Sequence, residues 1–267
     1  MKKTIISGIT LGWLCWGFSL PVKGETVLEK IQRTGVLQVA IREDAPPFGY
    51  LDSNQDLRGY CLGFFALLEK QLLDSLNRQT LSIKLLKSTT NNRFNLVSNN
   101  LVDLECGPNT IKNNIAEDLT FSQDFFTTGT QFLVKENDRN RLDLDSNLKD
   151  VRLGVVKNTT TEEFVTSTYP SAQIIKFSGT TGKSRGIQAV MQGKIDGMVS
   201  DGILLRAEAQ QLGLSRARYR LIPQVPILSD RYGMIIKAKD PQWQDLVNSV
   251  INSPQANSLS QAWFGGK

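Results

Sequence analysis

The chain has 267 residues, and its 31 Lys and Arg residues outnumber its 26 Asp and Glu residues, which gives a formal net charge of +5. It contains no histidine, which excludes Ser-His-Asp and Cys-His catalysis and removes the commonest metal ligand. The length is sufficient for two compact lobes of roughly 100 residues each.

An uncharged apolar run, residues 4–22 (TIISGITLGWLCWGFSLPV), follows Lys2 and Lys3. A positively charged start, an apolar run and a small-residue exit are typical of a secretory signal peptide. The run is also close to the ~20 residues that span a bilayer, so a transmembrane anchor is the alternative. The Gly and Pro residues within the run favour cleavage. We expect residues 1–24 to be a signal peptide cleaved near Gly24, which leaves a periplasmic protein.

Cleavage there removes three lysines and no acidic residue, so 28 basic residues remain against 26 acidic ones and the mature net charge is +2. The mature chain has no run of five or more Lys or Arg residues. Clustered basic residues are the usual sequence signal for nucleic acid or an anionic membrane surface. We therefore expect neither of these as a partner.

Short apolar runs alternate with amphipathic stretches from Val27 onward, which is typical of βα units and a largely parallel sheet. In the first half, helical spacing of apolar residues predicts helices over 26–33, 63–76 and 93–99. Strands are expected over 36–41, 82–86 and 104–107, and Pro and Gly residues predict a loop over 45–50.

The second half begins with an extended crossing strand over 129–135 and a polar surface loop over 136–150. A second α/β cycle follows, with strands at 151–156, 174–175 and 195–199 and helices at 160–169, 187–191 and 203–211. The segment 222–236 suits a second crossing, and helices at 240–251 and 257–263 are expected to pack on the first lobe.

Two cysteines, Cys61 and Cys106, remain after cleavage. An oxidising compartment permits them to form a disulfide, and two separate buried thiols are the alternative. The sequence has no cluster of metal ligands and no glycine-rich phosphate loop, so we predict neither a metal nor a cofactor.

Nine short motifs cover nearly all of the mature chain. They are residues 28–37 (LEKI and GVL), 47–50 (PFGY), 92–93 (NR), 102–107 (VDLECG), 121–122 (FS), 154–162 (GVV and TTTE), 193–201 (GKIDG and Asp201), 232–233 (YG) and 263–265 (WFG). In this order they resemble the family of periplasmic amino-acid-binding proteins of ABC transporters, particularly its glutamate/aspartate and polar amino-acid branch.

The resemblance implies an α/β, two-lobed periplasmic-binding-protein fold, in which each lobe is a mostly parallel sheet flanked by helices. Two hinge strands join the lobes, and the ligand is held between them by hinge closure. Lobe 1 is expected to comprise residues 25–131 plus 229–267, and lobe 2 residues 132–228. The implied partners are a small polar ligand, foremost an amino acid, and an ABC permease, and the protein is expected to be a monomer.

Two segments of the second lobe offer groups that suit an amino acid. Asp201 ends a predicted strand, where α/β sheets place ligand-facing residues, and its carboxylate suits an α-amino group. Capping of the next helix is the alternative for this side chain. Thr159 and Thr160 precede a helix whose first N–H groups suit an α-carboxylate. An ordinary capping box with Glu162 or Glu163 is their alternative.

The first lobe has its own candidate ligand residues. Thr110 offers a hydroxyl and Gly107 a close backbone approach. Phe48 and Tyr50 suit contact with apolar parts of the ligand, or else ordinary packing within the lobe. By the resemblance, Arg93 is placed to assist an acidic ligand side chain, and a surface or capping role is its alternative.

The sequence departs from the family pattern in the first lobe. Ile115 stands where the family carries an arginine that clamps the α-carboxylate, and Lys112 is the nearest substitute charge. Gly63 and Cys61 replace family acids, which predicts a less acidic cleft.

Three functions follow from these observations. The first is a solute-binding subunit that delivers a polar ligand, foremost an amino acid, to a permease. The second is an orphan or sensor protein that keeps the fold without amino-acid transport, and Ile115 and Gly63 motivate it. The third is an enzyme on the same scaffold, such as a periplasmic dehydratase. No residue pattern in the sequence indicates a general acid–base pair, so we expect no catalytic residues and no enzyme.

Overall fold

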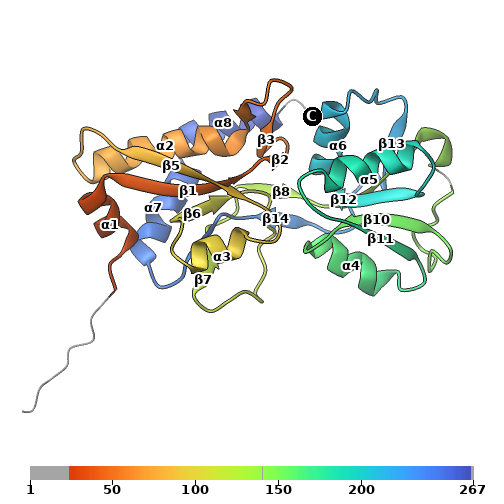
Figure 1. The fold of residues 1–267 in the computed structure, drawn as a ribbon, viewed down its shortest axis with the longest axis horizontal. Coiled ribbons are helices and arrows are strands. Elements are labelled where there is room, and N and C mark those ends of the chain that lie inside the picture. Colours follow the sequence, from red (N-terminus) through yellow and green to blue (C-terminus); the bar gives the residue numbers. More distant parts are fainter. Residues whose placement is uncertain (1–23, 140, 266–267) are drawn as a thin grey trace, which may run out of the picture.

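The computed structural model describes residues 24–139 and 141–265, which form two lobes that lie side by side (Figure 1). The predicted signal peptide, apart from Gly24, lies outside the described residues. Within the described ranges, no helix is both long enough and apolar enough to cross a membrane.

The first lobe contains a five-stranded sheet in the order β5–β1–β6–β15–β7. Its strands are β1 (Val36–Arg42), β5 (Ser82–Ser88), β6 (Leu104–Cys106), β7 (Leu119–Phe121) and β15 (Ile235–Lys237). β1 pairs in parallel with β5 and β6, whereas β15 runs antiparallel to both of its neighbours.

The second lobe repeats this plan in the order β11–β10–β12–β9–β13. Its strands are β9 (Thr130–Lys135), β10 (Arg152–Val156), β11 (Gln173–Phe177), β12 (Gly197–Asp201) and β13 (Tyr219–Ile222). Here β9 is the reversed strand, antiparallel to β12 and β13. Both sheets are mostly parallel, as the alternating pattern predicts.

Two short strands, β8 (Phe126–Thr128) and β14 (Asp230–Tyr232), pair antiparallel and form a ribbon that connects the lobes. β8 leads into the reversed strand β9, and β14 leads into the reversed strand β15. A strand that enters antiparallel to its neighbours starts beside their carboxyl ends, so both sheets turn their carboxyl edges toward the ribbon. The crossing was predicted at 129–135, but the chain crosses between the lobes at β8, a few residues earlier. Residues 130–135 form β9, which belongs to the sheet of the second lobe.

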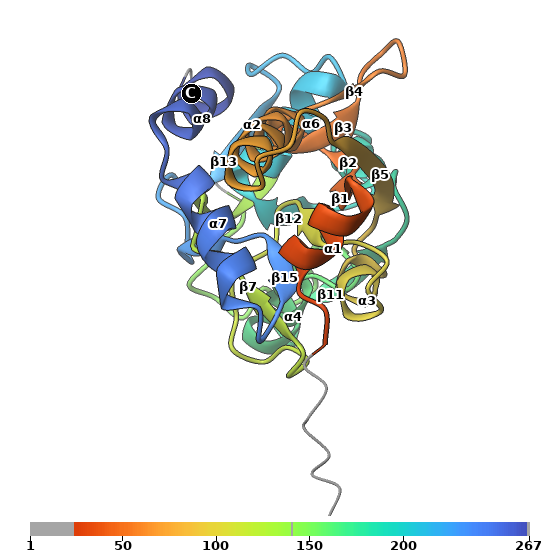
Figure 2. The same cartoon turned by 90° about the vertical axis from the view of Figure 1, so that its left-hand side faces the viewer.

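Helices cover both faces of each sheet (Figures 1 and 2). They are α1 (Val27–Thr34), α2 (Tyr60–Ser75), α3 (Arg93–Ser98), α7 (Pro241–Ile251) and α8 (Pro254–Phe264) in the first lobe, and α4 (Thr160–Thr168), α5 (Gly182–Met191) and α6 (Gly202–Gln211) in the second. Strand residues alternate between the two cores of a lobe: Phe132 and Val134 of β9 pack on the α4 side, whereas Leu133 packs on the α5 and α6 side.

Three helices begin at least three residues earlier than predicted, and one of them is α8, which begins at Pro254 rather than Asn257. α2 begins at Tyr60 rather than Gly63, and α5 begins at Gly182 rather than Ile187. The first turn of α5 is polar and glycine-rich, so it carries no helical apolar signal. Gly186, in the next turn, allows the helix to pack closely on the sheet, because a Cβ there would lie only 2.4 Å from the Met198 sulfur.

The segment predicted as a loop over 45–50 instead carries parts of a small three-stranded sheet. Its strands are β2 (Asp44–Ala45), β3 (Gly49–Leu51) and β4 (Leu57–Arg58). A 3₁₀ turn, Glu136–Asp138, begins the surface loop that follows β9.

Cys61 of α2 and Cys106 at the end of β6 form a disulfide in the core of the first lobe. The bond joins the first lobe's long helix to its central strand, directly before Gly107. It closes a segment of 45 residues. In the chain-entropy model a closed loop of this length restricts the unfolded ensemble substantially.

Replacing both cysteines (Cys61→Ala with Cys106→Ala) is expected to lower the free energy of unfolding by about 2–4 kcal/mol. The physical reason is the lost restriction on the unfolded chain. Urea denaturation of oxidised wild type, reduced wild type and the double variant measures the effect, and the last two should agree closely. Equal free energies for oxidised wild type and the variant would contradict a stabilising role for the bond.

Candidate functional site

A polar cleft lies between the lobes, where the carboxyl edges of the two sheets meet. The first lobe lines it with Arg42, Asp44, Thr90, Arg93, Thr110 and Lys112, among others. The second lobe contributes Thr159, Thr160, Lys183, Ser200 and Asp201. Most of these residues follow a strand or begin a helix, as expected for a ligand site in an α/β fold.

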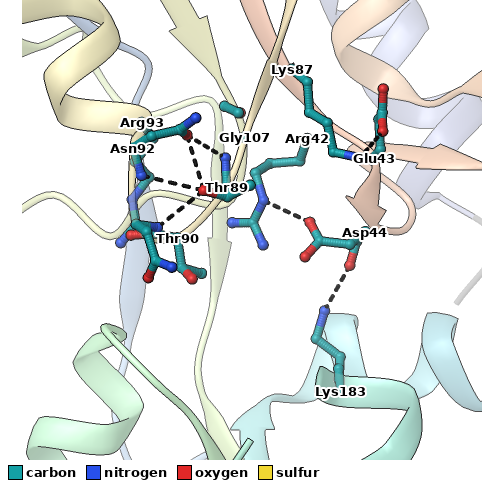
Figure 3. Close-up of polar contacts among 12 residues, drawn as sticks. Arg42, Glu43, Asp44, Lys87, Thr89, Thr90, Asn92, Arg93, Gly107 and Lys183 are labelled. Carbon is teal, nitrogen blue, oxygen red and sulfur yellow. Dashed lines mark hydrogen bonds and ion pairs between the residues drawn. The ribbon is translucent and has the colours of Figure 1, made fainter. Parts of the chain in front are cut away.

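Arg42 is the last residue of β1, and it is nearly inaccessible to solvent. Its Nε donates a 2.7 Å hydrogen bond to Oδ1 of Asp44, and this ion pair faces the second lobe (Figure 3). Nζ of Lys183, from α5, reaches across the cleft and donates to the backbone carbonyl of Asp44 at 3.3 Å. The two lobes thus touch through a cluster of charged residues.

Lys183 has no carboxylate within ion-pair distance among the described residues. Its side chain is buried, and burial lowers the pKa of its ammonium group, opposed by the more distant acids Glu208, Asp44 and Asp201. A buried ammonium group without a direct counter-charge favours the arrival of an anion.

Arg93 begins α3 and is 9 % exposed. Its guanidinium donates to the carbonyls of Thr90, at 3.2 Å, and of Asn158, at 3.4 Å on the opposite lobe, while its buried Nε has no partner in the described chain. Burial, followed by the nearby charge of Arg42, lowers the pKa of Arg93 to about 10. Its Nη groups donate to these two carbonyls, so Arg93 also lacks a direct counter-charge among residues 24–139 and 141–265.

Asp201 ends β12, and its side chain makes no capping bond to α6. Oδ2 accepts a hydrogen bond from the Tyr232 hydroxyl, whereas the buried Oδ1 has no partner among the described residues. Burial raises the pKa of Asp201 to about 7. The capping alternative is therefore wrong, and the ammonium site at Asp201 stays a prediction.

Glu105 of β6 is fully buried beneath the cleft, where it accepts 2.6 Å hydrogen bonds from the Ser88 hydroxyl and the Asn109 amide. Burial raises the pKa of its carboxyl group. Gly107 packs closely against this carboxylate: a Cβ at Gly107 would lie 3.0 Å from Oε1 of Glu105 and 3.1 Å from Cγ of Arg42. Gly107 therefore allows close packing beside the site without being one of the residues that line the cleft.

The threonines predicted for the second lobe divide into two roles. Thr159 is the N-cap of α4, and its hydroxyl accepts from the Glu162 N–H at 3.1 Å. The predicted capping box is incomplete, because the Glu162 carboxylate accepts from the Asn158 N–H instead of the Thr159 N–H. The Thr160 hydroxyl instead lies 3.3 Å from the Thr110 hydroxyl of the other lobe. The first-turn N–H groups of α4 have no acceptor within their own helix and lie beside this pair.

Two predicted aromatic contacts do not reach the cleft. Phe48 is fully buried in the first lobe, with its ring centroid 5.4 Å from those of Phe126 and Tyr232. Its predicted ligand contact is therefore wrong, because other aromatic rings enclose it. Tyr50 lines a separate hollow with Lys87 and Glu208.

Of the four residues discussed as departures from the family pattern, only Lys112 lines the cleft. Ile115 packs against a core of the first lobe, and Lys112 lines the cleft with its Nζ 3.8 Å from Glu163 of the second lobe. Gly63 packs against Leu259 of α8, and Cys61 is in the disulfide. The prediction that these two positions reduce cleft acidity is wrong, since neither lines the cleft.

Arg42, Asp44, Asn109 and Lys183 line the cleft, but sequence reasoning did not select them. Arg42 ends a predicted strand, so the same strand-end rule that selected Asp201 would have found it. Lys183 had no such signal, because the polar start of α5 was not recognised as a helix.

Few hydrogen bonds join the lobes across the cleft rim. The Asn158 amide donates to Oδ1 of Asn91 at 2.7 Å, and the Thr110–Thr160 and Lys183–Asp44 contacts lie deeper. Closure is thus supported by a small number of polar contacts. Among the described residues, no group of three or more His, Cys, Asp or Glu side chains is arranged to hold a metal.

This two-lobed architecture, with an interlobe cleft of charged residues, defines a solute-binding protein. The model of the bacterial extracellular solute-binding proteins, family 3, matches residues 37–266. The chain belongs to this family, and it is a solute-binding protein.

Individual relatives agree with this assignment. The chain is 28 % identical over 246 residues to the glutamate/aspartate import solute-binding protein of Escherichia coli (strain K12), covering 91 % of this chain and 80 % of that protein. It is 24 % identical over 247 residues to the L-glutamate/L-aspartate-binding protein of Pseudomonas aeruginosa, covering 89 % of this chain and 79 % of that protein.

Solved structures share the fold. An ancestral amino-acid-binding protein, a precursor of cyclohexadienyl dehydratase, superposes with a TM-score of 0.75 at 22 % identity, covering 90 % of this chain and 99 % of that one. A mutant of ArgBP from T. maritima gives a TM-score of 0.74 at 20 % identity, over 89 % and 99 % of the two chains. The predicted two-lobed α/β fold is confirmed.

Replacing Asn91 with alanine is expected to lower the ratio of closed to open ligand-free molecules about fivefold, because one neutral hydrogen bond contributes about 1 kcal/mol. Small-angle X-ray scattering of the mature protein measures this as a larger radius of gyration. Asn95→Ala, an exposed position on α3, is the matched control. The same radius in wild type and both variants would show that the Asn91–Asn158 contact does not support closure.

Proposed function

We propose that the protein binds an acidic amino acid, L-glutamate or L-aspartate, in the interlobe cleft and delivers it to an ABC permease. The observation that carries this proposal is the pair of buried cations, Arg93 and Lys183, that face the cleft without a direct carboxylate partner. The names of the glutamate/aspartate-binding relatives support the same ligand class.

The two cations come from opposite lobes, Arg93 from α3 and Lys183 from α5. A side-chain carboxylate between them would supply the counter-charge that each lacks. Charge-assisted hydrogen bonds are about twice as strong as neutral ones, so a ligand that bridges the lobes in this way also favours closure. Arg42 differs from these two cations, because its Nε is bonded to Asp44 and its charge therefore has a direct counter-charge.

The α-amino and α-carboxylate groups have separate candidate sites. The unpaired Oδ1 of Asp201 suits the ammonium group. The hydroxyls of Thr110 and Thr160, together with the N-terminal end of α4, suit the carboxylate, since that helix end carries a partial positive charge. In this arrangement the carboxylate needs no arginine at position 115.

The proposed location of the mature protein is the periplasm, after cleavage near Gly24, and its proposed state is a monomer. The export signal in the sequence supports the location. A protein that has kept the fold without amino-acid binding is the contrasting case, and titration separates the two.

Isothermal titration of the mature protein against the twenty amino acids tests the proposal. We expect heat for L-glutamate or L-aspartate, with weaker binding or none for uncharged amino acids. Silence toward all twenty would overturn the amino-acid assignment and favour an orphan or sensor role.

Lys183→Gln is expected to weaken L-glutamate binding by about 10- to 100-fold, because a hydrogen bond to a charged group contributes about 1.5–3 kcal/mol. Binding of L-glutamine, which has no side-chain charge, should change much less. Calorimetry of both ligands measures the ratio, with Lys149→Gln, exposed and outside the cleft, as the control. An equal loss of affinity for both ligands would show that Lys183 does not interact with the side-chain carboxylate.

A further inference from the structure

Two carboxyl groups meet where the connecting ribbon joins the second lobe. Asp201 ends β12 opposite Thr130 of β9, and Asp230 begins β14 opposite Thr128 of β8. The hydroxyl of Tyr232, two residues after Asp230, donates to Asp201, so the two carboxyl groups are neighbours. Both are more than nine-tenths buried, and Asp230 also contacts the Thr130 side chain. Asp201 lines the cleft, whereas Asp230 lies behind it on the ribbon.

The groups that surround this pair supply little positive charge. Tyr232 lies on the same strand as Asp230, and its hydroxyl donates to Asp201. Burial raises the pKa of Tyr232 well above its ordinary value, so this hydroxyl remains neutral. Lys183 on α5 acts on Asp201 from a longer distance, and Arg42 on β1 acts on Tyr232. Each of these cations also faces Asp44, and Lys183 faces Glu208.

Two buried carboxylates in contact repel each other and lose their hydration, so a single proton between them is favoured. The buried Oδ1 of Asp201 also lacks a donor within the described chain. A proton on the pair would relieve the repulsion, and the ammonium group of a ligand would satisfy the same carboxyl instead. Burial is the first cause that raises the pKa of both groups.

We propose that Asp201 and Asp230 share one proton in the ligand-free protein, and that the ammonium group of the bound ligand displaces this proton into solvent. The inference rests on the proposed function, in which Asp201 receives the ammonium group. Asp230 is a positioning residue in this scheme. It acts through Asp201 by sharing the proton, and it lies on β14, one of the two strands that connect the lobes.

The sign of the pH dependence follows from the raised pKa. The ammonium group binds the ionised carboxylate, so affinity is full above the pKa of Asp201 and falls as the pH drops through about 7. Well below that pH, the loss approaches tenfold per pH unit for one displaced proton. The protons released per ligand rise over the same range.

Calorimetry of L-glutamate and L-aspartate binding at about pH 6, in two buffers of different ionisation enthalpy, measures the released protons directly. For the mature wild type we expect nearly one proton per bound ligand. For Asp230→Asn we expect several-fold fewer, because the like charge is removed and the amide can donate to Asp201. Asp124→Asn is the control, since Asp124 pairs with Arg231 of the ribbon at 3.5 Å on its exposed side.

Carbon-13 NMR of the aspartate carboxyl groups tests the shared proton without a ligand. We expect Asp201 and Asp230 to titrate together in the wild type, and Asp201 to titrate at lower pH in Asp230→Asn. Ligand binding without proton release, with both carboxyls titrating in their ordinary range, would overturn this inference and leave the proposed function intact. A shared titration with no binding of either amino acid would instead overturn the proposed function and the displacement step.

A purely structural role for Asp230 has its own signature. Asp230→Asn would then weaken binding equally at all pH values and leave the proton release unchanged. That result would contradict the inference, whatever the size of the loss in affinity.

Discussion

The site depends on the way the chain crosses between its lobes. β8 and β14 form one ribbon, and each leads into its sheet as the single reversed strand. This connection forces the carboxyl edges of both sheets to face the same gap, so residues that end strands in separate lobes meet there. Arg42 of β1 and Asp201 of β12 are two such residues.

Where these edges meet, several charged side chains are buried. Arg93, Lys183 and Asp201 are each buried, and each retains a polar atom or charge that no described residue satisfies. Buried charges of this kind destabilise a fold unless a partner compensates them. A zwitterionic ligand with an additional carboxylate supplies the opposite sign at each position, so the features that destabilise the empty site favour binding and closure.

The sequence predicted the fold well because alternating apolar runs and helical spacing depend on local chemistry. β9 was located within one residue, but its assignment as a crossing was wrong, because periodicity does not reveal which sheet a strand joins. The candidate site was only partly predictable. Asp201 could be found from its strand end, whereas Phe48 could not be separated from core packing, since both roles require the same aromatic side chain in the same loop. Lys183 was missed because a polar, glycine-rich helix start has no apolar pattern.

The central claim is that an acidic amino acid satisfies the unpaired charges of the cleft. A crystal structure of the mature protein grown with L-glutamate tests it most directly. The account predicts the side-chain carboxylate between Arg93 and Lys183 and the ammonium group on Asp201. A ligand bound with its side chain away from both cations, or an empty cleft at saturating L-glutamate, would contradict it.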